Sequence, residues 1–249
     1  MTAFVAAGRR VLPRGWGDLF RQLTIWFGFL LVYQIARGIA DRNPTRAFNN
    51  GLKVIDIERH ANALYELSFQ RIADSSSFVT SAAAWTYWNS EFTVIGVALL
   101  FVYLRRHEAF TKFRNTLLLA NGIGLVGYVL LPTAPPRMFP DLGFADTLEN
   151  FGTLNHGDGL ISFAANPYAA MPSLHAADAL IVGLVLAGLC RRRAYKVLWC
   201  VWPLWVWFSV MATGNHFWLD VVAGIFVAAI ALWVVYRRDL RSEPAVSTA

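Results

Sequence analysis

Three short polar clusters interrupt an otherwise apolar chain, at residues 132–138, 170–175 and 213–220. Within the third cluster, His216 and Asp220 are four residues apart, so on a helix the carboxylate can approach the imidazole. A carboxylate that holds Nδ1–H fixes the tautomer of a histidine and raises the basicity of Nε2. The spacing therefore predicts a histidine that acts as a nucleophile or a base.

The other two clusters supply a second histidine and a permanent cation. His175 follows a Pro-Ser pair typical of a helix start, where free backbone N–H groups attract an anion. Arg137 carries a guanidinium fork that suits phosphate. Together they predict phosphoryl transfer: His216 attacks phosphorus, His175 protonates the leaving oxygen, and Arg137 holds the equatorial oxygens. We expect the neighbouring Ser173 and Asn215 to help bind the substrate.

Other interpretations of these polar residues remain open from the sequence. A single histidine or aspartate in a membrane can be a helix-packing group, and Arg137 could anchor a lipid headgroup. Asp178, one turn after His175, either orients that histidine or solvates a polar cleft, and Glu91 lies at a similar depth. A metal site would need ligands drawn from His156, His175, His216 and Asp220. No tight ligand spacing supports it, so we expect neither a metal nor a cofactor.

The composition indicates the environment in which these clusters lie. Of 249 residues, 56% are hydrophobic and 15% are charged, against about 45–50% and about 25% in soluble domains. One aqueous core cannot bury so many apolar side chains, so the chain is predicted to be an integral membrane protein. The net charge of +6 fits basic cytoplasmic loops better than a nucleic-acid site, and we expect no nucleic-acid partner.

Six apolar segments are long enough to be candidate membrane spans. They are residues 23–40, 78–104, 115–131, 174–189, 197–213 and 219–236. Their continuous apolar runs favour helices over barrel strands, which would alternate. The predicted fold is an all-α, polytopic bundle of six transmembrane helices in one domain over residues 23–236. Residues 1–22 and 237–249 are predicted to be a cytoplasmic N-terminal segment and a cytoplasmic tail, with no cleaved signal peptide.

Most of the 22 lysines and arginines orient these spans. They precede the first span, separate the second from the third and the fourth from the fifth, and follow the sixth. The positive-inside rule makes that face cytoplasmic and puts both termini there. Residues 132–173, with Arg137 as their one basic residue, then form an outer loop that carries the candidate site. Residues 41–77 are predicted to be an outer loop with amphipathic helix at the membrane interface.

Two of the clusters resemble the signature of the type 2 phosphatidic acid phosphatase superfamily. That signature is Pro-Ser-Gly-His, then Ser-Arg, five residues, His, three residues and Asp. This chain has Pro-Ser-Leu-His at 172–175, and its Ser209, His216 and Asp220 keep the later spacing. The resemblance implies a six-helix membrane enzyme with its site at the non-cytoplasmic surface. It also implies that His216 is the nucleophile, Asp220 its partner and His175 the acid.

The departures from that signature form a pattern of their own. They are Leu174 for the Gly, Val210 for the phosphate-binding Arg, Leu130 for an upstream Lys and Met138 for a Pro. With Ala-Pro-Pro-Arg at 134–137, they resemble the branch that contains inositol phosphorylceramide synthases and their bacterial relatives. Arg137 then matches the phosphate-binding position. Loss of the Arg weakens the phosphate clamp, which favours a phosphodiester substrate over a monoester.

The expected function is therefore that of a metal-independent lipid phosphatase or phosphotransferase in the cell membrane, with its site on the non-cytoplasmic side. Its substrate would be a phospholipid or lipid phosphate in the bilayer. A phosphohistidine would pass phosphate to water, or a phospho-headgroup to or from a polyol such as inositol. The rival interpretation is a non-catalytic lipid-binding or transport protein, which broken helices and paired repeats would favour. The sequence shows neither feature.

Overall fold

The computed structural model describes residues 12–39, 43–148 and 166–242, and in these ranges the regular secondary structure is helical. The α-helices are α2 (Gly15–Ile39), α3 (Pro44–His60), α4 (Glu66–Asp74), α5 (Ser77–Asn89), α6 (Ile95–Arg105), α7 (His107–Leu130), α9 (Leu174–Leu189), α10 (Arg193–Ala212) and α11 (Trp218–Ser242). A π-helical turn, η1 (Ser90–Val94), joins α5 to α6. Two 3₁₀ turns, η2 (Pro136–Met138) and η3 (Pro140–Leu142), follow α7.

Five of the six predicted spans are confirmed as helices long and apolar enough to cross a membrane. They are Gly15–Gly38, Ser77–Arg105, His107–Leu130, Arg193–Ala212 and Trp218–Arg237. The remaining predicted span is α9, an apolar helix of 16 residues. At 1.5 Å per residue it is about 24 Å long, shorter than the roughly 30 Å hydrocarbon core of a bilayer. The all-helical fold is confirmed, and the sixth span stays a prediction.

The predicted helix ends differ from the observed ones where polar residues continue an apolar run. Helix α2 begins at Gly15 and α7 at His107, each well before the predicted span. Hydropathy locates the apolar stretch of a helix but not the polar turns that extend it. The second predicted span consists of α5, η1 and α6, so the polar residues Ser90 and Glu91 lie within a continuous helical segment.

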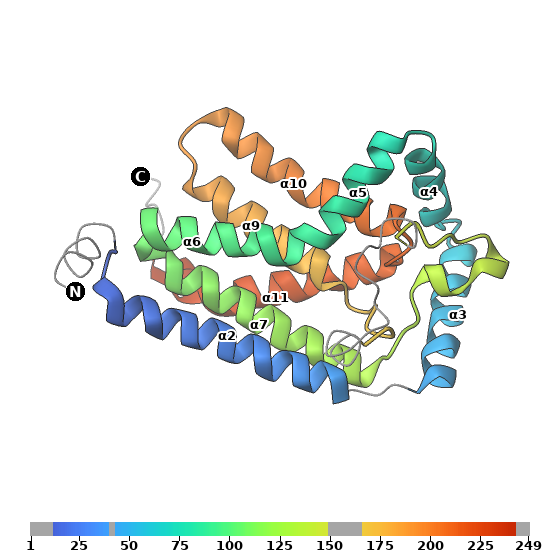
Figure 1. Ribbon diagram of the computed structural model, residues 1–249, viewed down its shortest axis with the longest axis horizontal. Helices are drawn as coiled ribbons and strands as arrows, with labels where there is room; N and C mark the ends of the chain where they lie inside the picture. The colour runs from blue at the N-terminus through green and yellow to red at the C-terminus, as the bar shows by residue number, and fades with distance from the viewer. Residues whose placement is uncertain (1–11, 40–42, 149–165, 243–249) are drawn as a thin grey trace, which may run out of the picture.

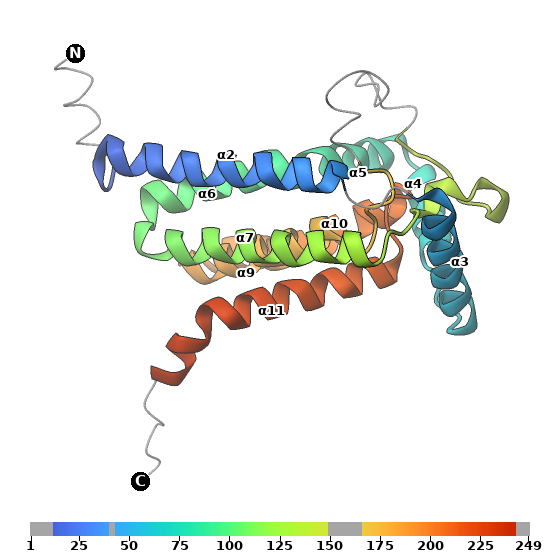
Figure 2. The same cartoon turned by 90° about the horizontal axis from the view of Figure 1, so that it is seen from below.

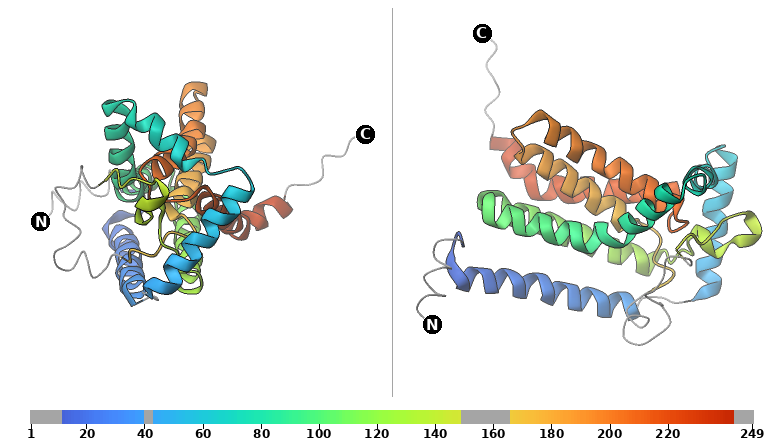
Figure 3. Two further views of the ribbon diagram at one scale, coloured as in Figure 1. Left: turned by 90° about the vertical axis from the view of Figure 1, so that its right-hand side faces the viewer. Right: turned by 45° about the horizontal axis from the view of Figure 1, so that its top comes forward.

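The long helices run side by side, and α3 stands across one end of the bundle (Figures 1 and 2). At the opposite end lie the start of α2, the α6–α7 and α9–α10 junctions and the end of α11. Figure 3 looks along the bundle from the α3 end in its left view. The basic stretches between predicted spans occupy those two junctions, where α6 ends at Arg105 and α10 begins at Arg193. They therefore lie at the end of the bundle away from α3.

The first turns of α9 and α11 are packed tightly together. The Ser173 backbone N–H donates to the Asp220 carbonyl at 2.9 Å. A Cβ added to Gly224 would overlap the Ser173 carbonyl oxygen, so the close approach of α11 to the start of α9 requires a glycine. Two of the polar clusters, 170–175 and 213–220, are thereby brought into direct contact.

Candidate active site

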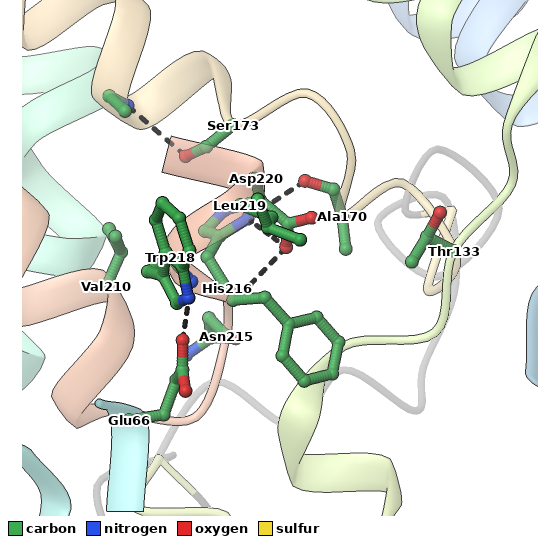
Figure 4. A network of polar contacts seen from close by, with 12 residues as sticks. Glu66, Thr133, Ala170, Ser173, Val210, Asn215, His216, Trp218, Leu219 and Asp220 are labelled. Atoms are coloured by element: carbon green, nitrogen blue, oxygen red, sulfur yellow. Dashed lines mark hydrogen bonds and ion pairs between the residues drawn. The ribbon is translucent and has the colours of Figure 1, made fainter. Parts of the chain in front are cut away.

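His216 lies in the turn between α10 and α11, with its ring held from one side. Its Nδ1 is 2.9 Å from the Ala170 carbonyl oxygen and 3.5 Å from Asp220 Oδ2 (Figure 4). Because a carbonyl oxygen only accepts hydrogen bonds, Nδ1 carries the proton and Nε2 keeps its lone pair. Burial lowers the pKa of His216 well below its ordinary range, so the imidazole is neutral.

Asp220 lies near His216, but not along one helix face as the spacing suggested: His216 precedes α11, and Asp220 is not its nearest acceptor. Its Oδ2 accepts the Phe217 backbone N–H at 2.9 Å, and the side chain is fully buried. The carboxylate thus caps the start of α11 while lying beside the imidazole. The carbonyl of Ala170, which no side-chain pattern could indicate, is the group that holds Nδ1–H.

His175 lies in the first turn of α9 and faces the same space. Its Nε2 is 3.5 Å from Glu91 Oε2, and its ring stacks on Tyr87 with centroids 4.6 Å apart. The His175 and His216 rings have centroids 5.7 Å apart. Asp178 instead accepts two hydrogen bonds from Asn121 Nδ2, at 3.1 and 3.0 Å. Glu91, rather than Asp178, is the carboxylate beside His175.

Arg137 and Asn215 form a hydrogen-bonded pair at the edge of the site. Arg137 Nη1 donates to Asn215 Oδ1, and Arg137 Nε is 3.6 Å from Asp146 Oδ2. The Arg137 backbone N–H also donates to the Gly214 carbonyl at 2.9 Å. Gly214 has a φ of +71°, and a Cβ there would lie 2.5 Å from the Ala145 carbonyl oxygen. This glycine turn therefore lets the loop of Arg137 lie against the loop of His216.

One pocket collects most of the predicted residues. Arg137, His175, His216 and Asn215 line it together with Glu91 and Tyr87. Asp220 is buried beside His216. Ser173, expected to bind substrate, is buried and caps α9, its Oγ accepting the Ala176 backbone N–H at 3.3 Å. Ser173 is not one of the described residues that line the pocket.

Two buried glutamates support the site from α3 and α4, and no motif in the sequence predicted either of them. Glu58 Oε1 accepts the Leu219 backbone N–H at 3.2 Å. Glu66 Oε1 accepts the Trp218 backbone N–H (Figure 4). Burial and the nearby charge of Glu66 raise the pKa of Glu58, and burial likewise raises that of Glu66. With Asp220, they take up the first backbone N–H groups of α11. The sequence feature that could have indicated them is an acidic residue on the buried face of each amphipathic helix.

The site also contains a basic residue that no motif predicted. Arg37, near the end of α2, lines the pocket. The sequence feature that could have indicated it is a charged residue inside a predicted span, because such residues are costly in a membrane and usually functional. In the described ranges, no group of three or more His, Cys, Asp or Glu side chains is close enough to hold a metal. His156 lies outside the described residues, and metal independence stays a prediction.

Comparison with known proteins assigns the chain to a family. The profile of the PAP2 superfamily matches residues 52–234. A phosphoinositol dihydroceramide synthase of Bacteroides thetaiotaomicron is 28% identical over 155 residues, 57% of this chain and 50% of that protein. The match thus spans about half the length of that curated relative. No solved structure matches the chain. This integral membrane protein belongs to the PAP2 superfamily, in the branch that resembles inositol phosphorylceramide synthases.

Proposed function

We propose that this protein is a membrane lipid phosphatase or phosphotransferase that works through a phosphohistidine on His216. The observation that carries the proposal is the tautomer of this residue. Its Nδ1–H donates to the Ala170 carbonyl at 2.9 Å, so the Nε2 lone pair is free to attack. Asp220, with Oδ2 at 3.5 Å, stabilises the positive charge that develops on the ring. Arg137 and His175 line the same pocket.

In the first step, His216 Nε2 attacks the phosphorus of a lipid phosphate ester and the bond to the leaving oxygen breaks. His175, as the imidazolium, gives its proton to that oxygen, and Glu91 orients its ring and stabilises its charge. Arg137 binds the non-bridging oxygens. In the second step, an oxygen of water or of an alcohol attacks phosphorus, neutral His175 takes its proton, and the phosphorus–nitrogen bond breaks.

The two other predicted residues act through their neighbours. Asn215 accepts from Arg137 and donates to Thr213 Oγ1 at 2.9 Å, so it fixes the guanidinium toward the substrate. Ser173 caps α9 and so positions His175, two residues later. Neither step draws on a metal ion, and activity that persists in a chelator is the expected result.

The acceptor separates hydrolysis from transfer, because both begin with the same phosphohistidine. The name of the Bacteroides relative supports transfer of a phospho-headgroup to or from inositol. A lipid phosphate ester in the bilayer is the common substrate of both routes. The assay is a panel of lipid phosphates and phospholipids with and without inositol, with the products identified.

The basic helix junctions also suggest how the protein lies in the membrane. We infer six spans, with α9 as the short sixth, and both termini in the cytoplasm. The site then faces the non-cytoplasmic side, since it lies at the α3 end of the bundle. The membrane domain would comprise residues 23–236, with outer loops at 41–77 and 132–173, between the cytoplasmic segments 1–22 and 237–249.

The nucleophile is tested by His216→Ala, with His60→Ala as the matched control because the His60 side chain is 79% exposed. We expect His216→Ala to abolish both hydrolysis and transfer, and to abolish labelling of the protein by a substrate with a radiolabelled phosphoryl group. His60→Ala should retain both. Activity of His216→Ala above about a tenth of wild type would exclude a nucleophilic His216, since such residues contribute several orders of magnitude.

A further inference from the structure

Arg37 reaches the active-site pocket from a helix that lies outside the matched family region. It sits near the C-terminal end of α2, whereas the family profile begins at residue 52. It nevertheless lines the same pocket as Arg137, His175 and His216. The pocket therefore has two guanidinium groups, from segments far apart in the chain.

Among the described residues, Glu91 shares both pockets with Arg37 but forms no direct ion pair with it. The Arg37 guanidinium carbon lies 5.8 Å from the centre of the buried Tyr128 ring. Its Nε is buried and has no hydrogen-bond partner in the described ranges. A buried N–H donor without a partner costs free energy, and an anion bound in the pocket would pair it. A cation that merely anchors a helix end at the membrane interface would instead extend into water or headgroups.

Arg37 also stands where two pockets meet. The second pocket is lined by Trp26, Phe29, Leu30 and Phe92, and shares Arg37 and Glu91 with the first. Its apolar side chains, which also include Ile95, come from α2, η1 and α6, and its polar lining includes Asn121 and Asp178. An amphiphile whose anionic group lies beside Arg37 could leave its apolar chain against these aromatic side chains. This arrangement fits a lipid phosphate better than a small soluble anion.

The superfamily signature has basic residues where this chain has Val210 and Leu130, and these apolar side chains cannot bind phosphate. Val210 is fully buried and packs in an apolar cluster with Ala176, Val206 and Val221. Leu130 is 60% exposed at the end of α7.

We propose that Arg37 is a second phosphate-binding residue, which holds the non-reacting oxygens of a lipid phosphate ester opposite Arg137. This inference rests on the proposed function, because it assumes that phosphate occupies the pocket.

The test measures binding rather than turnover, on the His216→Ala protein in detergent. The thermal unfolding midpoint is recorded with three probes: inorganic phosphate, a long-chain lipid phosphate monoester and the corresponding lipid alcohol. A ligand that binds the folded state raises this midpoint. We expect Arg37→Met to weaken both phosphate probes about 10-fold to 100-fold, the range for hydrogen bonds to charged groups. Arg37→Lys should weaken them less.

The control is Arg21→Met on the same helix, since the Arg21 side chain is 68% exposed. It should bind all three probes as the parent does, and the lipid alcohol should bind equally to the parent and to Arg37→Met. Equal weakening of phosphate and alcohol, or unchanged phosphate binding in Arg37→Met, would overturn the proposal. Because no turnover is needed, this result is independent of whether His216 is the nucleophile. Weakening of the lipid phosphate with no change for the lipid alcohol would support it, since only the phosphate group distinguishes these two probes.

Discussion

Glu58 offers a direct test of how the start of α11, and with it the site, is held. Its Oε1 accepts the Leu219 N–H at 3.2 Å and its side chain is fully buried. Glutamine keeps an acceptor of the same shape, whereas alanine leaves a buried donor unpaired, at a cost of about 1–3 kcal/mol. Each kcal/mol shifts the unfolding midpoint by about 2–4 °C at this chain length. Glu58→Ala should therefore melt roughly 2–12 °C below wild type.

The pH dependence of the same variants gives a second, independent readout. The pKa of Glu58 is raised in the folded protein by burial and by the nearby charge of Glu66. A raised carboxyl pKa contributes stability below the ordinary value, near 4.5, and that stability is lost as pH rises through the raised value. The wild-type midpoint should therefore fall between about pH 5.5 and about pH 8.5. It should fall less in Glu58→Gln, because glutamine does not ionise.

The assay is thermal unfolding in detergent, followed by tryptophan fluorescence at both pH values. Glu108→Gln is the matched control, since Glu108 is an exposed carboxylate in the first turn of α7. It should change neither the midpoint nor its pH dependence. Equal losses for Glu58→Ala and Glu58→Gln would refute the role of the Leu219 bond. The same pH slope in wild type and Glu58→Gln would refute a raised pKa.

Two further predictions concern the glycine contact and the second histidine. Gly224→Ala should prevent the close approach of α11 to the Ser173 carbonyl, and so lower both the unfolding midpoint and the activity. Gly96→Ala is the control, since a Cβ there meets open space, and it should lower neither. Equal effects of the two substitutions would contradict the packing argument. Glu91→Gln should slow turnover of lipid esters at least about 10-fold through loss of acid catalysis by His175. An aryl phosphate with a good leaving group should be much less affected, and an equal loss on both substrates would exclude that role.

Much of the fold and part of the site were predictable because their signals are local. Apolar runs located the helices, since a span must be about 20 residues of mostly apolar side chain whatever surrounds it. The approach of Asp220 to His216 was predictable as a contact over a short separation, although it forms in the capped turn before α11 and not on a helix face. The helix ends were less predictable, since polar turns extend α2 and α7 beyond their apolar stretches.

The sequence by itself determined the class of protein, the approximate helices, the family signature and the residues able to do phosphoryl chemistry. Only the tertiary structure decided that Ala170 holds His216, that Glu91 lies beside His175, and that Glu58 supports α11. It also decided that Arg37 enters the pocket. These contacts join segments far apart in the chain, through a backbone carbonyl or a charge with no motif around it. No periodicity or spacing encodes them, because they arise only when the helices pack.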